Sequence, residues 1–424
     1  MPNLIPAPAS LQRLEGDPHH GEPPHGELTG SGAPESYALE VTSDRVTLTA
    51  PDEAGLFYGR RTLEQLRGPD GSMPPVRIED APRFAHRGVM LDVARHFFGV
   101  ADVKRFIDLA AGYKLNVLHL HLTDDQGWRL ESPKWPRLTS TGATTQIGGG
   151  PGGFYTRQDY AEIVRYAGER FMTVIPELDV PGHTNAALLA YPELGPDGVA
   201  PPPETGIHSP GRSLNVGDPA VLRFLDDVVG ELAQITPGPY IHLGADEVEG
   251  MTDDDYRAFI HAAAEIVSRH GKRMIGWEEM AAVELPPGVI VQFWTDPKLR
   301  DAAVRQGAPL IMSPAPHTYL DQKYDASTEL GLSWAGNVDV RDAYEWEPGD
   351  DALGVEAALW TETVEDFGAI AYMTLPRLPA VAEVAWSARR DWEDFKLRLA
   401  AHGPQWEALG LNFHRSPQVP WTAS

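Results

Sequence analysis

Residues 87–122 contain the pattern that decides the fold: the apolar run RGVMLDV at 87–93, the stretch DVKRFIDLAAGY at 102–113 and the apolar run NVLHLHL at 116–122. Short runs that are almost continuously apolar are typical of strands buried on both faces. The stretch between them has the spacing of a helix that packs along one side. A strand, a helix and a second strand in this order predict two parallel strands joined by a crossover helix.

The same rhythm continues along the chain in six further apolar runs, several of them separated by helical stretches. Eight such units over about 300 residues predict a closed (β/α)8 TIM barrel of the α/β class. An open, doubly wound sheet stays possible, but that fold usually has a glycine fingerprint after its first strand, and none follows residue 93. The six runs are FMTVIPELD (171–179), YIHLGAD (240–246), RMIGWE (273–278), VIVQFW (289–294), PLIMSP (309–314) and VEAALW (355–360).

The chain ahead of the barrel predicts an arm and a small, shortened α+β domain. Residues 1–36 are rich in Pro, Gly and His without a sustained period, which indicates a poorly ordered arm or loop. Within 37–82, YALEVTSDRVTLTA alternates apolar and polar residues about a Ser-Asp turn, and AGLFYGRRTLEQLRG has helical spacing. We therefore expect a small α/β N-terminal domain at 37–82 and a barrel with C-terminal helices at 83–424.

The composition excludes several classes of function. The 424 residues include 35 Lys and Arg against 61 Asp and Glu, which gives a formal net charge of -26 at pH 7. Binding nucleic acid or an anionic membrane needs clustered positive charge, so neither is an expected partner. Cys is absent, which excludes disulfides, zinc-thiolate centres and cysteine nucleophiles. The sequence has no apolar run long enough for a membrane span and no secretory signal pattern at its start. We expect a cytoplasmic protein unless a leader was removed.

Polar residues cluster where the predicted strands end. In a parallel barrel all C-terminal strand ends open on one face, so these side chains converge even when they are far apart in sequence. Asp246 and Glu247 directly follow an apolar strand, where charges without a task would be costly. Carboxylates, imidazoles and tryptophans together suit a neutral polyol, because acids bond hydroxyl groups and indole faces stack on a sugar ring. The residues at these ends are Arg87, Asp92, His121, Asp124, Asp125, Glu177, Asp179, His183, Asp246, Glu247, Trp277, Glu278, Trp294, Trp360 and Glu362.

Two other kinds of protein fit parts of this pattern. His119 and His121 alternate onto one side of their strand and could ligate Zn2+ or Mn2+ in a metal-dependent barrel hydrolase. The spacing does not show whether that side faces the barrel interior. A non-catalytic carbohydrate-binding barrel is the second alternative. The further ligands that the metal hypothesis would use are Asp124, Asp179, His183, His242 and Asp246.

Two long connections rich in Gly and Pro follow the second and third predicted strands, at 139–156 and 192–216. Loops of this length in a compact domain are usually functional or disordered. We expect the first to form a mobile rim of a binding site, and both to influence which substrates fit.

The strand-end motifs, taken in order, resemble those of family 20 of the glycoside hydrolases, the β-N-acetylhexosaminidases. The matching strings span about residues 85–390, and EVTSDRVTLTAPDEAGLFYGRRTLEQL resembles the end of the small domain that precedes the barrel in that family. Two departures are Ala245, where the family usually has a second Gly, and a leading domain that is shorter than usual. The strings are RGVMLDVARHF, NVLHLHLTDDQGWRLE, VIPELDVPGHT, HLGADEV, GWEE, VQFW, TYLDQKY, VRDAYEWEP and GVEAALWTET.

The resemblance implies an exo-acting, retaining enzyme that removes terminal β-linked GlcNAc or GalNAc, for example from chitooligosaccharides, and needs no metal or organic cofactor. Retaining glycosidases ordinarily use a second carboxylate as nucleophile, and substrate-assisted families are the exception. In the implied mechanism the acetamido oxygen of the substrate attacks the anomeric carbon and forms an oxazolinium intermediate. A neighbouring Asp and Glu can serve this reaction from one strand end if their side chains diverge.

The roles of individual residues also follow from the resemblance. Glu247 would be the general acid and later the base, Asp246 would orient the acetamido group, and Asp124 with His183 would tune the proton affinity of Glu247. Because an acid that works near neutral pH needs a raised pKa, we expect burial and nearby carboxylates to raise the pKa of Glu247. The other implied contacts are Tyr319 to the acetamido oxygen, Trp277, Trp294 and Trp360 around its methyl group, and Arg87, Asp321 and Glu362 to sugar hydroxyls.

Overall fold

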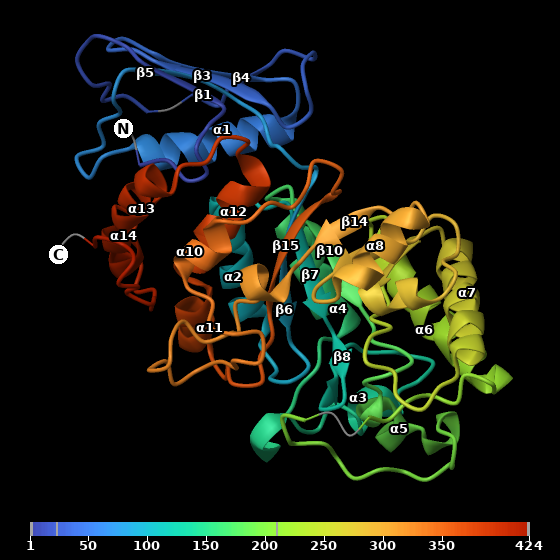
Figure 1. The fold of residues 1–424 in the computed structure, drawn as a ribbon. Helices are drawn as coiled ribbons and strands as arrows, with labels where there is room; N and C mark the ends of the chain where they lie inside the picture. The colour runs from blue at the N-terminus through green and yellow to red at the C-terminus, as the bar shows by residue number, and fades with distance from the viewer. Residues whose placement is uncertain (1–2, 23, 209–210, 422–424) are drawn as a thin grey trace.

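The computed structural model describes residues 3–22, 24–208 and 211–421. It consists of a small sheet domain and a barrel, with the C-terminal helices packed between the two (Figure 1). Among the described residues, no helix is both long and apolar enough to cross a membrane.

Eight parallel strands close into a barrel, in the order β10-β11-β12-β13-β14-β15-β6-β7. All eight apolar runs of the sequence form these strands, so the predicted TIM barrel is confirmed. The strands are β6 (His86–Asp92), β7 (Val117–His121), β10 (Thr173–Glu177), β11 (Tyr240–His242), β12 (Arg273–Trp277), β13 (Ile290–Phe293), β14 (Leu310–Met312) and β15 (Gly354–Leu359).

Amphipathic helices cover the outside of the barrel (Figure 1). Several of their first turns are held by side chains that accept a backbone N–H, such as Thr156 before α4 and Thr252 before α7. The longer barrel helices are α2 (Val100–Gly112), α4 (Arg157–Gly168), α6 (Pro219–Ile235), α7 (Asp253–Arg269), α8 (Pro297–Arg305), α11 (Phe367–Thr374) and α12 (Arg377–Trp386), followed by α13 (Trp392–Ala400) and α14 (Gly403–Ala408). Shorter elements are α3 (Arg137–Ser140), α5 (Asn185–Ala190), α9 (Ala315–Thr318), α10 (Val340–Tyr344), and the hairpin β8 (Thr123–Asp124) with β9 (Gly127–Trp128).

The inside of the barrel has an apolar part and a charged part. Side chains alternate along a strand, so Val117, His119 and His121 of β7 share one face. Val117 packs with isoleucines from four other strands in a small apolar cluster. His119 and His121 instead contact carboxylates from β10 and β15. The sequence did not show where the face of β7 with His119 and His121 points, and in the structure it points into the barrel interior. That interior therefore contains buried ionisable groups.

The small domain is a five-stranded sheet of order β1-β5-β3-β4-β2, with α1 (Glu53–Leu66) between it and the barrel (Figure 1). The predicted hairpin is present as the antiparallel pair of β3 and β4. The expectation of a poorly ordered arm or loop over 1–36 is wrong for the described residues 3–22 and 24–36, because β1 pairs with β5, β2 pairs with β4, and Leu4 and Ile5 are buried. The apolar–polar pattern of these edge strands is too short to show in the sequence. The strands are β1 (Ser10–Arg13), β2 (Glu27–Leu28), β3 (Tyr37–Val41), β4 (Val46–Ala50) and β5 (Val76–Asp80).

Arg87 joins the small domain to the barrel. Its guanidinium is fully buried and donates both terminal nitrogens to Glu35, at 3.0 and 3.1 Å. It also donates to the Tyr58 hydroxyl of α1 and to the backbone oxygens of Phe84 and Lys114. A fork that fills this many acceptors is the geometry in which Arg is irreplaceable.

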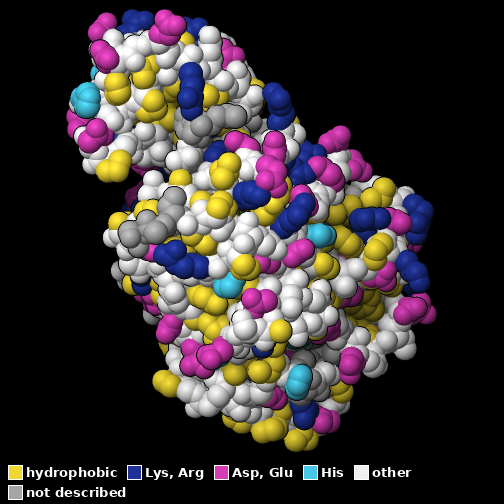
Figure 2. Space-filling model, turned by 60° about the vertical axis from the view of Figure 1, so that its left-hand side comes forward, with side chains coloured by type: hydrophobic (Ala, Val, Ile, Leu, Met, Phe, Trp, Pro, Cys, Tyr) yellow, Lys and Arg dark blue, Asp and Glu magenta, His cyan; other side chains and the backbone are white. Residues whose placement is uncertain are grey.

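Acidic and basic side chains are interspersed on the face shown in Figure 2, with no large basic patch among the residues coloured there. This distribution agrees with the excess of Asp and Glu in the sequence.

Replacing Arg87 with Ala should lower the free energy of unfolding by about 3–5 kcal/mol, because Glu35 and several buried acceptors lose their donor. Denaturant unfolding measures this change. The matched control is Arg45→Ala in the same domain. The Arg45 side chain is 73% exposed and its ion pair with Glu40 is long at 3.9 Å, so this substitution should change the free energy of unfolding by less than about 1 kcal/mol. Equal effects of the two substitutions would contradict the role given to Arg87.

Candidate active site

A cavity of about 450 Å³ opens at the C-terminal ends of the barrel strands. Its walls come from the segments that follow β6, β10, β11, β13, β14 and β15, and from the last residue of β12. This is the face on which TIM barrels carry their active sites. The lining residues are Arg95, His183, Ile207, His208, Asp246, Glu247, Trp277, Trp294, Tyr319, Asp321, Leu332, Ser333, Trp334, Trp360 and Glu362.

Asp246 and Glu247 lie at a sharp backbone turn after β11. Ala245 and Glu247 have φ values of 73° and 48°, in the left-handed region, which costs a residue other than Gly about 1–2 kcal/mol. Neighbouring bonds hold the turn: Trp277 N–H donates to the Gly244 oxygen, and the Tyr256 hydroxyl donates to the Ala245 oxygen. Asp246 is buried, whereas 55% of the Glu247 side chain is exposed. One strand end thus offers two carboxyl groups in different surroundings.

Gly244, before this turn, is required by a close approach. A Cβ on Gly244 would lie 1.9 Å from Oδ1 of Asp179, and its φ is 63°. Asp179 is buried, and neither of its carboxyl oxygens has a hydrogen-bond partner among the described residues. Burial, together with the charge of Asp246, raises the pKa of Asp179 well above its ordinary value.

His183 lies between the acid pair and Asp124. Its Nε2 is 3.4 Å from Oε2 of Glu247 and 3.7 Å from Oδ2 of Asp246, and its Nδ1 is 3.3 Å from Oδ1 of Asp124. Burial alone would lower the pKa of His183, but the charge of Asp124 and their hydrogen bond raise it well above the ordinary value. Both ring nitrogens face carboxylates, which an imidazole satisfies with two N–H groups only when it is protonated.

The pKa of Glu247 is lowered in the structure, whereas the sequence led us to expect a raised one. The bond with His183 lowers the pKa of Glu247, and this outweighs its partial burial. Burial instead raises the pKa of Asp246 to about 6. The expectation for Glu247 is therefore wrong, because Glu247 contacts an imidazolium and remains open to water.

The aromatic residues form one continuous wall. Trp294 stacks on Tyr319 with ring centroids 6.2 Å apart, and Trp360 lies 5.9 Å from Trp277 and 6.1 Å from Tyr319. All four were expected in the site, and the structure brings them together beside Asp246. Trp334 was not expected; its ring packs edge-on against Trp294, and 53% of it is exposed. A tryptophan inside a long loop has no strand end to indicate its place, so no sequence signal pointed to Trp334.

Arg87 does not lie in the cavity, so its assignment to sugar hydroxyls is wrong. It stands near the start of β6, five residues before Asp92, and a strand rises about 3.3 Å per residue, so it belongs to the opposite end of the barrel. The arginine in the cavity is Arg95, three residues after β6. Its guanidinium contacts Asp124 at 2.8 Å and lies over the Trp360 ring at 4.9 Å. The position of Arg95 after the strand end was the missed signal.

Asp321 and Glu362 lie together in the wall, as expected. Burial and the charge of Glu362 raise the pKa of Asp321 to about 8, and burial also raises the pKa of Glu362 despite the nearby Arg95. Oδ1 of Asp321 and Oε2 of Glu362 are buried without a hydrogen-bond partner among the described residues. Unused acceptors in a cavity wall are suited to hydroxyl groups of a ligand.

The long connections contribute unequally to the cavity. Ile207 and His208 of the second loop line it, whereas no described residue of 139–156 does. Residues 139–156 instead wrap the buried Arg129, which donates to the backbone oxygens of Ala143, Thr145 and Gly153. The rim predicted for the first loop is therefore supplied by the second. Residues 209–210 lie outside the described part of the chain.

The charged interior below the cavity bears on the metal hypothesis. Three groups have the spacing that an ion needs: His119, Glu177 and His242; His121, Glu177 and Asp179; and Asp124, Asp179 and His183. In His119 and His121, however, both ring nitrogens already lie 2.5–3.0 Å from carboxylate oxygens. Nitrogens that donate to carboxylates, as Nδ1 of His119 and both nitrogens of His121 do, have no lone pair for a metal. Nε2 of His119 lies 3.0 Å from Glu177 without a hydrogen bond. The geometry favours ion pairing within the protein.

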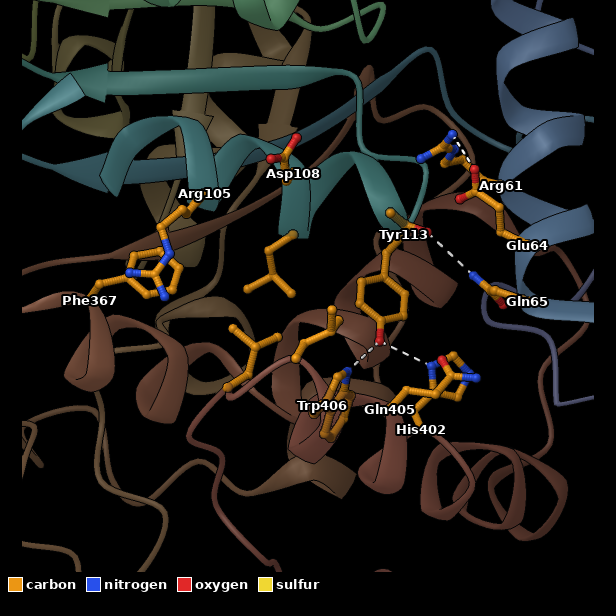
Figure 3. A pocket seen from close by; sticks show the side chains of 14 residues that line it. Arg61, Glu64, Gln65, Arg105, Asp108, Tyr113, Phe367, His402, Gln405 and Trp406 are labelled. Atoms are coloured by element: carbon orange, nitrogen blue, oxygen red, sulfur yellow. Dashed lines mark hydrogen bonds and ion pairs between the residues drawn. The ribbon is translucent and has the colours of Figure 1, made fainter. Parts of the chain in front are cut away.

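A second cavity, of about 400 Å³, is lined mainly by residues of α1, α2 and α14 and shares no lining residue with the first (Figure 3). Its polar groups bond one another: the Tyr113 hydroxyl contacts Trp406 and His402, and Gln65 donates to the Gly112 oxygen. These bonds serve the packing of the small domain and the C-terminal helices against α2.

Comparison with known proteins identifies the family. The model of the glycosyl hydrolase family 20 catalytic domain matches residues 84–389, and that of domain 2 of the same family matches residues 25–81. The chain belongs to glycosyl hydrolase family 20. It is a glycoside hydrolase, a β-N-acetylhexosaminidase, and its small domain is the second domain of that family.

Individual relatives agree with this assignment. A β-N-acetylhexosaminidase of Cellulomonas fimi is 49% identical over 404 residues, covering 91% of this chain and 82% of the relative. The N-acetyl-β-hexosaminidase of Streptomyces plicatus, solved in complex with Thio-NAglucal, has a TM-score of 0.95 at 44% identity and covers 99% of this chain and 98% of its own. The family 20 enzyme of Streptomyces coelicolor A3(2) has a TM-score of 0.96 at 43% identity, with 99% of each chain covered.

Replacing Asp321 with Asn should stabilise the protein at pH 8. A folded-state pKa of about 8 lies above the ordinary value of about 3.9, so the stability of the wild type is fully present below pH 4 and is lost as the pH rises through 8. The Asn variant should lose this slope and gain roughly 1–3 kcal/mol at pH 8. Denaturant unfolding at pH 5 and pH 8 measures it. Asp350→Asn, at a side chain 98% exposed, is the control and should follow the wild type. If Asp321→Asn keeps the full pH dependence of unfolding that the wild type has, the raised pKa of Asp321 is refuted.

Proposed function

We propose that this enzyme is an exo-acting, retaining β-N-acetylhexosaminidase that removes terminal β-linked GlcNAc or GalNAc with the substrate's own acetamido group as nucleophile. The observation that supports this most directly is the aromatic wall beside the buried Asp246. A mutant of the Streptomyces plicatus relative is described in complex with the product GlcNAc, and a relative from Vibrio harveyi is an N,N'-diacetylchitobiase. Chitooligosaccharides are accordingly the substrates that we propose for this chain.

The wall of Trp277, Trp294 and Trp360 would enclose the acetamido methyl group. Apolar surfaces on three sides leave the amide one orientation, in which its oxygen reaches the Tyr319 hydroxyl and the anomeric carbon. Fixing the attacking group in this way makes the displacement intramolecular, which can supply several kcal/mol of the barrier. Asp246, once ionised, would accept the amide N–H and stabilise the positive charge of the oxazolinium ring.

The sugar hydroxyls would be held by Arg95, Asp321 and Glu362. This replaces the contact first assigned to Arg87. The protonated form of Asp321 can both donate and accept, as neutral sugar hydroxyls require.

Glu247 and His183 would share the proton that the reaction uses. At the start His183 carries it and Glu247 is ionised, across the 3.4 Å contact. A bound sugar takes water away from Glu247, and this desolvation favours the protonated carboxyl. The proton then passes from Nε2 to Glu247 and on to the glycosidic oxygen, while the acetamido oxygen bonds C1 and the C1–O bond to the leaving group breaks. In the second step ionised Glu247 takes a proton from water. The water oxygen bonds C1 while the bond between C1 and the acetamido oxygen breaks, which opens the oxazolinium ring.

This scheme predicts a bell-shaped pH dependence of kcat/KM. The acid limb should lie near pH 6, where Asp246 becomes ionised, and the alkaline limb should mark loss of the proton shared by His183 and Glu247. Glu247→Gln should lower kcat/KM on 4-methylumbelliferyl GlcNAc by at least about 10²-fold, and much less on an aryl GlcNAc whose leaving group needs no proton. Its alkaline limb should disappear. Equal losses on both substrates would contradict the acid role.

The acetamido group should be indispensable. The aryl β-glucoside that matches an aryl β-GlcNAc substrate lacks the internal nucleophile and should react at least about 10³-fold more slowly in kcat/KM, since effective molarities are this large or larger. Comparable rates would show that a side chain of the enzyme attacks. Dialysis against a chelator is the companion measurement: activity lost there and restored by Zn2+ would support the metallohydrolase instead.

A further inference from the structure

A chain of alternating imidazoles and carboxylates runs through the barrel interior and ends at the acid. From Glu247 and His183 it passes to Asp124, whose Oδ2 lies 2.9 Å from Nε2 of His121. Nδ1 of His121 in turn lies 2.5 Å from Oε2 of Glu177. The same oxygen of Glu177 lies 3.0 Å from Nε2 of His119. Nδ1 of His119 lies 2.8 Å from Oε1 of Glu356, the last carboxylate along this path, on β15.

Both ring nitrogens of His121 hydrogen-bond carboxylates, so this ring fits its place only as an imidazolium. Nδ1 of His119 bonds Glu356, whereas its Nε2 lies 3.0 Å from Glu177 without hydrogen-bond geometry. Burial alone would lower the pKa of these histidines, but Glu177 and the other carboxylates raise the pKa of His119 to about 9 and that of His121 well above its ordinary value. The positive charge of His121 in turn lies directly against Asp124, the residue that holds His183.

We propose that Glu177 is a positioning residue for the hydrolysis: by keeping His121 protonated beneath Asp124, it sets how the shared proton is divided between His183 and Glu247. This inference rests on the proposed function. Nothing in it requires Glu177 to touch the sugar, because Glu177 is fully buried behind Trp277, whose Nε1–H it accepts at 3.0 Å.

The contacts of Glu177 determine what an amide would do in its place. Oε1 accepts Trp277 Nε1–H, and it also lies 2.9 Å from Nδ1 of His242, which already accepts the Gly244 N–H. An amide oxygen therefore belongs at the Oε1 position. The amide nitrogen then replaces Oε2, which bonds Nδ1 of His121, and it can donate to that nitrogen only if the nitrogen carries a lone pair. Glu177→Gln should thus make the imidazole of His121 neutral.

The loss of charge at His121 should change how the proton is divided between His183 and Glu247. Asp124 would keep Arg95 and His183 as cationic partners but lose the third, so it would hold the shared proton on His183 more firmly. Two opposite effects on activity follow: the alkaline limb moves to higher pH, and less of the proton reaches Glu247. The other ionisable groups that face this part of the chain are Asp92 beside Arg95, Asp125 and Asp246 beside His183, and Asp179 beside Asp246.

The decisive experiment compares Glu177→Gln with Glu356→Gln on 4-methylumbelliferyl GlcNAc across the pH range. At Glu356, Oε1 already accepts Gln292 Nε2–H and faces His119, so an amide oxygen there preserves the proton of His119 and leaves His121 unchanged. The control loses the same charge from the same buried chain. We expect Glu177→Gln to lower kcat about 10-fold with KM changed less than about 3-fold, and to move the alkaline limb up by at least about half a pH unit. Glu356→Gln should retain the wild-type limb.

An alkaline limb that is unmoved or moved to lower pH in Glu177→Gln, or equal shifts in both variants, would overturn the inference. If Glu177→Gln does not fold, neutron diffraction of the wild type decides: we expect deuterium on both ring nitrogens of His121, and a single deuteron would overturn the inference. Failure of the proposed function would give a different result from failure of this inference: the alkaline limb of kcat/KM would then persist in Glu247→Gln.

Discussion

The pairing of buried imidazoles with buried carboxylates is the constraint on which the rest of the structure depends. Isolated charges in a barrel interior would be severely destabilising, and a partly satisfied network is worse than an apolar core. Here His119 and His121 bridge Glu356, Glu177 and Asp124, so each charge is compensated along the barrel axis. The pairing fixes which faces of β7, β10 and β15 point inward, and it places Asp124 and His183 beneath the acid.

Small residues make room for these groups. A Cβ on Gly88 of β6 would lie 2.3 Å from Oε2 of Glu356, and a Cβ on Gly244 would collide with Asp179. Gly88 in β6 and Gly244 after β11 therefore mark close approaches of buried carboxyls. The left-handed Ala245 and Glu247 are a further local cost, because the turn that carries one buried and one exposed acid has that backbone.

The two ends of the barrel divide stability and chemistry. At the N-terminal end Arg87 spends all its donors on Glu35, Tyr58 and backbone oxygens, and it fixes the small domain. At the C-terminal end Arg95 contacts Asp124 beside the cavity, and Asp321 remains short of partners. Unsatisfied acceptors and neutral carboxyls at that end are unfavourable for folding, and they are what a polar ligand can satisfy.

The sequence by itself determined the barrel, its eight strands and most of the site, because strand periodicity and the rule that parallel strands end on one face need no distances. The strand ends indicated Asp246, Glu247, His183, Glu362 and the three tryptophans, and the family resemblance added Tyr319 and Asp321; all of them line one cavity. Arg95 could have been placed in the site as well, since it follows the end of the predicted strand whereas Arg87 begins it. Tertiary structure alone decided the rest, including the burial of Arg87 against Glu35 and Tyr58. The protonation of the acid pair likewise depends on burial and on which nitrogen faces which oxygen, and those quantities exist only once distant strands have come together.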